Sequence, residues 1–155
     1  IYIKRKNLNW LQVADWVAPY LALGHGIGRI GCFLVGDDYG IPCDLPWACS
    51  FPNGLPPTDI YVHPTQLYEM IAYFLVFLYL RYWKNNVHYL GEIMFEYLFL
   101  VGLSRFLIEF IRTNPKYLLG LSGAQYISII MILVAMYNMY SFRMSKETTP
   151  EQNLD

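Results

Sequence analysis

The most constraining feature of this chain is a set of four long hydrophobic stretches, separated by short polar segments and one longer loop. A helix needs about 20 mostly apolar residues to cross the hydrocarbon core of a bilayer, and each stretch has about that length. The sequence therefore predicts an all-α polytopic membrane protein with four transmembrane helices. We place the spans at residues 11–35, 64–83, 90–111 and 122–142.

The composition agrees with this fold class. Hydrophobic residues make up 55% of the chain and charged residues 15%, whereas soluble domains carry about 25% charged residues. The net charge of −1 excludes a general electrostatic binder of nucleic acid. We predict a transmembrane domain over residues 1–142 and a polar cytoplasmic tail over 143–155. Because the chain begins with Ile1 and shows no cleavable signal pattern there, we expect an N-terminally truncated fragment.

The basic residues of the loops predict the orientation in the membrane. Seven of them fall on one side: Lys4, Arg5, Lys6, Arg81, Lys84, Arg143 and Lys146. The loop 36–62 contains no Lys or Arg. By the positive-inside rule, both ends of the chain are cytoplasmic and this loop is periplasmic or extracellular. Cys43 and Cys49 lie in the loop and either form a disulfide there or remain free.

Two arginines are predicted to lie at the same depth of the membrane. Arg29 is near the outer end of the first span and Arg105 near that of the third, each within about 10 Å of the boundary at 1.5 Å per residue. The outer turns of the second span hold His63, Gln66 and Glu69. Ionisable residues within a membrane are costly and by default functional. A guanidinium group matches a phosphate, so we predict a site for an anionic lipid headgroup.

A purely structural interpretation of these charges stays open. Arg105 would then pair with Glu109 one turn away, and Arg29 with Asp37 or Glu69, because buried charges need partners. In the functional interpretation, Glu109 orients Arg105 instead.

Several smaller features allow more than one interpretation. Gly28 either clears space beside Arg29 or forms a helix-packing pair with Gly24. His25 is expected to be a hydrogen-bonded packing residue. The cysteines and His63 lack the compact spacing of a metal site, so neither a metal nor a cofactor is predicted. Ser104 is expected to be a packing residue, although an intramembrane serine hydrolase remains an alternative.

Four motifs together resemble the prolipoprotein diacylglyceryl transferase family. They are GRIGCF at 28–33 followed by GDDYG at 36–40, HPTQLYE at 63–69, GLSRFLIEFIR at 102–112, and GAQYIS at 123–128. The resemblance implies the last four helices of a bacterial inner-membrane protein with about seven. It also implies transfer of a diacylglyceryl group from phosphatidylglycerol to the lipobox cysteine in the signal peptide of a prolipoprotein.

The resemblance also assigns roles and shows three departures. It implies that Arg29 holds the lipid phosphate with help from Arg105, and that the missing helices carry a further histidine. Asp37 stands where the family has a glutamate, Cys32 where it has an asparagine, and Val101 where it has a tyrosine. The alternative function is therefore a non-catalytic or altered-specificity lipid-binding paralogue.

The sequence thus yields two overlapping sets of candidate site residues. The candidate catalytic residues are Arg29, Arg105, Glu109, Asp37 and His63. The candidate lipid-binding residues are Arg29, Arg105, Gly28, Gly40, Gln66 and Glu69.

Overall fold

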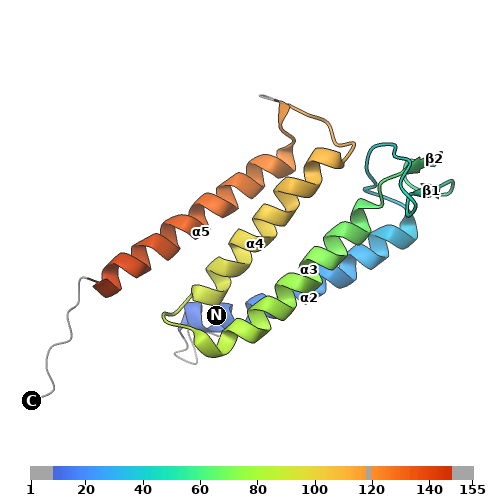
Figure 1. The fold of residues 1–155 in the computed structure, drawn as a ribbon. Helices are drawn as coiled ribbons and strands as arrows, with labels where there is room; N and C mark the ends of the chain where they lie inside the picture. The colour runs from blue at the N-terminus through green and yellow to red at the C-terminus, as the bar shows by residue number, and fades with distance from the viewer. Residues whose placement is uncertain (1–8, 118–119, 148–155) are drawn as a thin grey trace, which may run out of the picture.

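The computed structural model describes residues 9–117 and 120–147 and is mostly helical (Figure 1). In chain order its elements are α2 (Trp10–Val35), β1 (Cys49–Phe51), β2 (Thr58–Val62), α3 (Thr65–Trp83), η1 (Lys84–Asn86), α4 (Glu92–Ile108), η2 (Glu109–Ile111) and α5 (Gly123–Glu147). Four long helices therefore lie where the four hydrophobic stretches were predicted. The third is shorter than expected, since its last turn tightens into the 3-10 segment η2.

The helix α2 has recognisable signals at both ends. The side chain of Asn9 accepts a hydrogen bond from the Leu11 amide at 3.0 Å and so caps the first turn. Gly36 ends the helix with a φ of 75°, a conformation that favours glycine. A Cβ atom at Gly36 would also lie 2.9 Å from the Cα of Gly54, so the turn from α2 into the loop 36–62 (the outer loop of the predicted orientation) requires glycine.

The helices pack as two pairs that meet at α4. The α2 helix lies along α3, α4 lies along α5, and both α2 and α3 also contact α4 (Figure 1). The buried apolar core lies between α2, α3 and α4. It comprises Ala18, Ala22, Tyr73, Val76, Leu80, Ile93, Tyr97 and Val101.

Buried acidic side chains hold one end of this bundle together. Asp15 of α2 accepts hydrogen bonds from the amides of Gly91 at 2.6 Å and Met94 at 2.9 Å, at the start of α4. Glu92 accepts from the indole N–H of Trp83 and the amide of His88. These carboxylates satisfy donors that the helix start would otherwise leave unpaired. Glu92 therefore faces the bundle.

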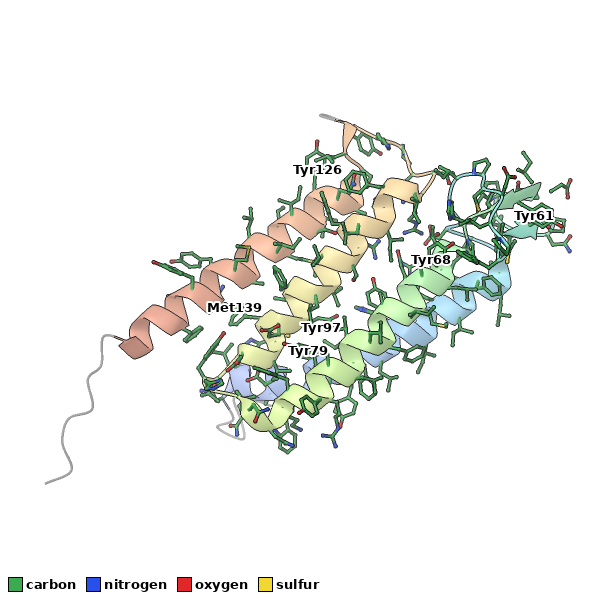
Figure 2. All side chains as sticks on the ribbon, viewed as in Figure 1. Tyr61, Tyr68, Tyr79, Tyr97, Tyr126 and Met139 are labelled. Carbon is green, nitrogen blue, oxygen red and sulfur yellow. The ribbon has the colours of Figure 1, made fainter. Side chains whose placement is uncertain are left out.

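The outer surface of the helices is apolar, whereas much of the interior is polar. Large hydrophobic side chains are exposed along α2, α3 and α5, including Leu34 at 78%, Leu75 at 61% and Ile130 at 61% (Figure 2). By contrast, Gln66, Glu69 and Glu109 are almost completely buried. An apolar patch of this extent marks a surface that contacts lipid or protein.

By length and hydropathy, Gly123–Phe142 in α5 is the one segment among the described helices that qualifies as a membrane span. It coincides with the predicted fourth span. The helix α4 has only 17 residues, and α2 and α3 carry buried charged or polar side chains such as Asp15 and Glu69, which lower the mean hydropathy. The helix α5 continues to Glu147, into the predicted tail, whose residues 148–155 lie outside the described residues.

The loop between α2 and α3 contains a small hairpin that the sequence did not predict. Its strands β1 and β2 are antiparallel, with Cys49 opposite Val62 and Phe51 opposite Thr58. Gly40 connects this loop to the bundle, because its amide donates to the His63 carbonyl at 2.8 Å. The hairpin therefore lies beside the C-terminal end of α2 and the N-terminal end of α3 (Figure 1).

Candidate active site

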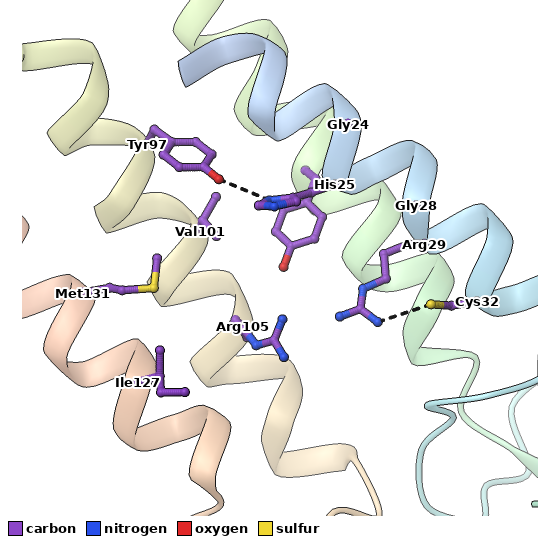
Figure 3. A pocket seen from close by; sticks show the side chains of 11 residues that line it. Gly24, His25, Gly28, Arg29, Cys32, Tyr97, Val101, Arg105, Ile127 and Met131 are labelled. Atoms are coloured by element: carbon purple, nitrogen blue, oxygen red, sulfur yellow. Dashed lines mark hydrogen bonds between the residues drawn. The ribbon is translucent and has the colours of Figure 1, made fainter. Parts of the chain in front are cut away.

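A cavity of about 440 Å³ lies between α2, α4 and α5, with α3 at its back (Figure 3). Arg29 projects into it from α2 and Arg105 from α4, so the two arginines predicted to converge share one cavity. The volume lies within the range of about 300–1,000 Å³ that is usual for small-molecule sites. The apolar side chains of Val101, Ile127 and Met131 form another part of the wall.

The glycines of α2 open this cavity. Ideal Cβ atoms at Gly24 and Gly28 would meet no other atom within 4 Å, and both residues line the cavity. Gly26 faces the other way, where a Cβ atom would lie 3.5 Å from the ring of Phe74. Among the described residues no helix packs against Gly24 or Gly28, and the space beside Arg29 is open at Gly28.

Arg29 is one member of a cluster of ion pairs in which Glu69, Glu109 and Arg112 are buried and Asp38 is exposed. Its Nη1 lies 2.9 Å from Asp38 Oδ2, and its Nε pairs with Glu69. Arg112 lies 2.6 Å from the same Asp38 oxygen, 3.4 Å from Glu69 and 3.7 Å from Glu109. Of the two partners considered for Arg29, the structure thus supports Glu69, whereas Asp38 replaces Asp37.

Arg105 differs from Arg29 in its surroundings. None of the carboxylates in the described part of the chain lies within 4.0 Å of its guanidinium group. The phenol of Tyr73 is a near neighbour of Arg105 and also lines the cavity. The guanidinium group of Arg105 therefore faces the cavity with no carboxylate within 4.0 Å among the described residues, although the carboxylate of Glu69 lies within electrostatic range, and it is in a position to attract an anion.

Glu109 does not orient Arg105 as predicted. It accepts hydrogen bonds from Ser122 Oγ at 2.6 Å and Asn114 Nδ2 at 2.7 Å, and it faces Arg112. The backbone of Glu109 is still helical, and its amide donates to the Arg105 carbonyl, so the difference lies in the partners of its side chain, which Ser122, Asn114 and Arg112 supply. Glu109 instead joins the end of η2 to the start of α5.

The start of α3 positions Asp37 and Asp38. Gln66 donates from its side-chain amide to the Asp37 carbonyl, and Thr65 Oγ1 donates to the Asp38 carbonyl at 2.6 Å. Burial acts to raise the pKa of Asp38, but the guanidinium groups of Arg112 and Arg29 hold it below its usual value. Asp38 is therefore a carboxylate at neutral pH and bridges both arginines.

Two further predicted site residues lie outside the cavity lining. His63 Nδ1 is 3.2 Å from the hydroxyl of Tyr68, which accepts from the indole N–H of Trp47 at 2.8 Å. Gly40 is packed so tightly that a Cβ atom would lie 2.5 Å from the Ile111 carbonyl oxygen. Both residues connect the outer loop to the bundle.

Four residues that the structure places at the site were not predicted from the sequence. His25 and Tyr97 line the cavity, and Arg112 and Asp38 complete the ion cluster. A usable signal existed for His25, since it precedes Arg29 by four residues and so shares its helix face. No comparable signal identified Tyr97, which approaches α2 only in the tertiary structure.

Other polar groups give no support to metal or serine chemistry. Cys32, Asp37 and Asp38 have ligand atoms within 4.8 Å of one another, but Asp38 already pairs with two arginines, whose charges disfavour a cation. Ser104 Oγ donates to the Val101 carbonyl of its own helix at 3.0 Å, as expected for a packing residue. Cys43 and Cys49 are free thiols.

Comparison with known proteins identifies the family. A model of the prolipoprotein diacylglyceryl transferases matches residues 1–141. The chain belongs to this family. The resemblance predicted from the four motifs is thereby confirmed.

Three relatives, each called a phosphatidylglycerol–prolipoprotein diacylglyceryl transferase, show the extent of the similarity. The protein of Clostridium tetani is 37% identical over 147 residues, which are 92% of this chain and 59% of the relative. That of Finegoldia magna is 40% identical over 134 residues, 86% of this chain and 52% of the relative. That of Idiomarina loihiensis is 33% identical over 144 residues, which are 90% of this chain and 53% of the relative. The chain thus spans between half and three fifths of the length of these transferases.

Proposed function

We propose that this chain is the C-terminal part of a membrane transferase that moves a diacylglyceryl group from phosphatidylglycerol to the lipobox cysteine thiol of a prolipoprotein. The observation that carries the proposal is the cavity shared by Arg29 and Arg105, in which Arg105 has no acidic partner among the described residues. The family relationship and the names of the relatives agree with this chemistry.

The two arginines would bind the phosphate of the donor lipid. During the reaction, a carbon–oxygen bond of the glyceryl group breaks and its electron pair remains on the phosphate. Positive charge that is already in place stabilises such a developing charge. The ion cluster would hold Arg29 in a fixed orientation, because Glu69 and Asp38 engage it from outside the cavity. The apolar wall formed by Ile127 and Met131 suits the acyl chains.

The membrane arrangement follows from the same features. In this proposal α2, α3, α4 and α5 all cross a bacterial inner membrane, and residues 1–142 form a transmembrane transferase domain. Their exposed apolar surfaces support this, because lipid would cover them. The basic residues Arg81 and Lys84 lie at the same end as the start of α2, where the ammonium of Lys84 is 4.9 Å from the ring of Trp16. That end would be cytoplasmic.

The proposed orientation predicts where thiol reagents reach the protein. Cys43 and Cys49 are free, partly exposed thiols in the outer loop. A membrane-impermeant maleimide is expected to label them in cells whose outer barrier alone has been permeabilised, without prior reduction. A Cys43→Ser, Cys49→Ser double variant is the control for labelling at Cys32. Labelling that requires disruption of the inner membrane would contradict the orientation.

Complementation tests the function itself. We expect the full-length gene, expressed in a strain depleted of its own transferase, to restore diacylglyceryl-modified prolipoprotein. The modification is detected by the added mass, and prolipoprotein that lacks it is processed more slowly.

An alternative function is suggested because Cys32 and Val101 depart from the family pattern: a paralogue that binds phosphatidylglycerol without transferring its diacylglyceryl group. Binding of phosphatidylglycerol vesicles with no modified product in cells or in a purified assay would favour that alternative.

A further inference from the structure

His25 is placed for a role that the ion cluster does not fill. Its imidazole lines the cavity with Arg29 and Arg105, and both guanidinium groups lie within electrostatic range (Figure 3). Nδ1 of His25 is 3.2 Å from the hydroxyl of Tyr97. The rings of Tyr73 and Tyr97 flank the imidazole, with centroids 5.5 and 6.2 Å away. The imidazole is therefore fixed in position at the edge of the site.

The chain has three histidines, and the structure describes all of them. His63, just before α3, is hydrogen-bonded to the hydroxyl of Tyr68, and His88 lies 3.5 Å from Glu92 at the opposite end of the bundle. Of the three, His25 alone lines the cavity. The acceptor in the proposed reaction is a thiol with an ordinary pKa near 8.5, and the thiolate is the nucleophile. The reaction thus needs a proton acceptor, for which an imidazole is suited at neutral pH.

We propose that His25 is the general base of the transfer reaction and that Tyr97 is its positioning residue. The inference rests on the proposed function. The Tyr97 hydroxyl accepts the Nδ1–H of His25, so that the lone pair of Nε2 is free to receive the proton of the lipobox thiol. The sulfur then attacks the glyceryl carbon, a C–S bond forms, and the C–O bond to the phosphate breaks. The phosphate oxygen keeps the electron pair and takes the proton from the imidazolium, which regenerates neutral His25.

The neighbours of His25 fit this cycle. Arg29 and Arg105 would bind the phosphate while the C–O bond breaks and its oxygen becomes basic. His25 lies one turn before Arg29 on α2 and so is close enough to return the proton to that oxygen. The open space over Gly24 and Gly28 would let the lipid and the peptide meet there. Glu69 of α3 pairs with Arg29 and Arg112 and is thus not available to accept a proton from the thiol.

The test compares thiol and selenol acceptors with the full-length protein. For His25→Gln, we expect kcat with a lipobox cysteine peptide to fall roughly 10²- to 10⁴-fold, the usual contribution of a general base, with little change in KM. A selenocysteine peptide is ionised without a base, so it is expected to recover most of the loss. His88→Gln, a histidine at the other end of the bundle, is the matched control and should behave as wild type.

Tyr97→Phe provides a second variant that keeps the ring and its packing. Loss of the orienting hydroxyl is expected to lower kcat roughly 5- to 30-fold, which corresponds to about one or two kcal/mol. The selenocysteine peptide should again restore most of the lost rate.

An active His25→Gln enzyme would overturn the proposal, as would equal losses of rate with the thiol and the selenol peptide. A wild-type protein that binds phosphatidylglycerol but transfers nothing to either acceptor would refute the proposed function itself. Transfer by wild type combined with a full-rate His25→Gln variant would refute only the role of His25.

Discussion

Arg29→Lys in the full-length protein is expected to lose most of its diacylglyceryl transfer activity while it still inserts and folds. Lysine keeps the positive charge, and the nearby Glu69 and Asp38 can still pair with it. It lacks the planar fork that binds a phosphate through two hydrogen bonds. Loss of one charge-assisted bond of about 1.5–3 kcal/mol corresponds to roughly 10- to 150-fold in rate or binding.

A double-mutant cycle over Arg29 and Arg105 then separates the functional from the structural interpretation. If both side chains bind one phosphate, Arg29→Lys and Arg105→Lys are coupled in transfer activity and not in thermal stability. Arg81→Lys, on the exposed surface of α3, is the matched control. Independent effects on activity, or a fully active Arg29→Lys enzyme, would show that the arginines do not share a phosphate.

The second large effect is expected at Arg112, and it concerns stability. Its side chain is 2% exposed and faces three carboxylates, those of Asp38, Glu69 and Glu109. Arg112→Gln leaves buried acidic groups without their cation, a change that typically costs about 3–5 kcal/mol. We expect a clearly lower midpoint of thermal unfolding in detergent.

The rescue of this variant identifies the cause. Glu109→Gln added to Arg112→Gln removes one uncompensated negative charge, so the double variant should be more stable than Arg112→Gln alone. Lys116→Gln, which removes an exposed charge from the following segment, should leave the midpoint almost unchanged. A midpoint for Arg112→Gln equal to that of wild type would mean that the ion cluster does not contribute to the stability of the bundle.

The departures from the family pattern acquire a structural meaning. Cys32, in place of the family asparagine, has its sulfur 3.7 Å from Nη1 of Arg29 and lies on the cavity wall. Asp37 does not pair with Arg29, and its neighbour Asp38 does so instead. Val101 contributes a buried apolar contact to the same wall. The two arginines thus keep a shared cavity although their immediate neighbours differ from the pattern.

The sequence by itself predicted the family, the four helices and the convergence of Arg29 and Arg105 on one region. Each of these depends on local or one-dimensional information. Long apolar stretches set where helices lie, and the rise of about 1.5 Å per residue fixes how far along its helix a residue lies. The motifs in their order were sufficient to identify the family.

The tertiary structure alone decided which groups face one another. The packing of η2 against the start of α5 pairs the Glu109 side chain with Arg112 and Ser122, and Arg105 has no carboxylate within 4.0 Å among the described residues. The same packing brought Tyr97 to His25, 72 positions apart in the chain. A sequence pattern fixes the spacing along one helix, but the pairing of charges across helices depends on angles and distances that only the assembled bundle determines.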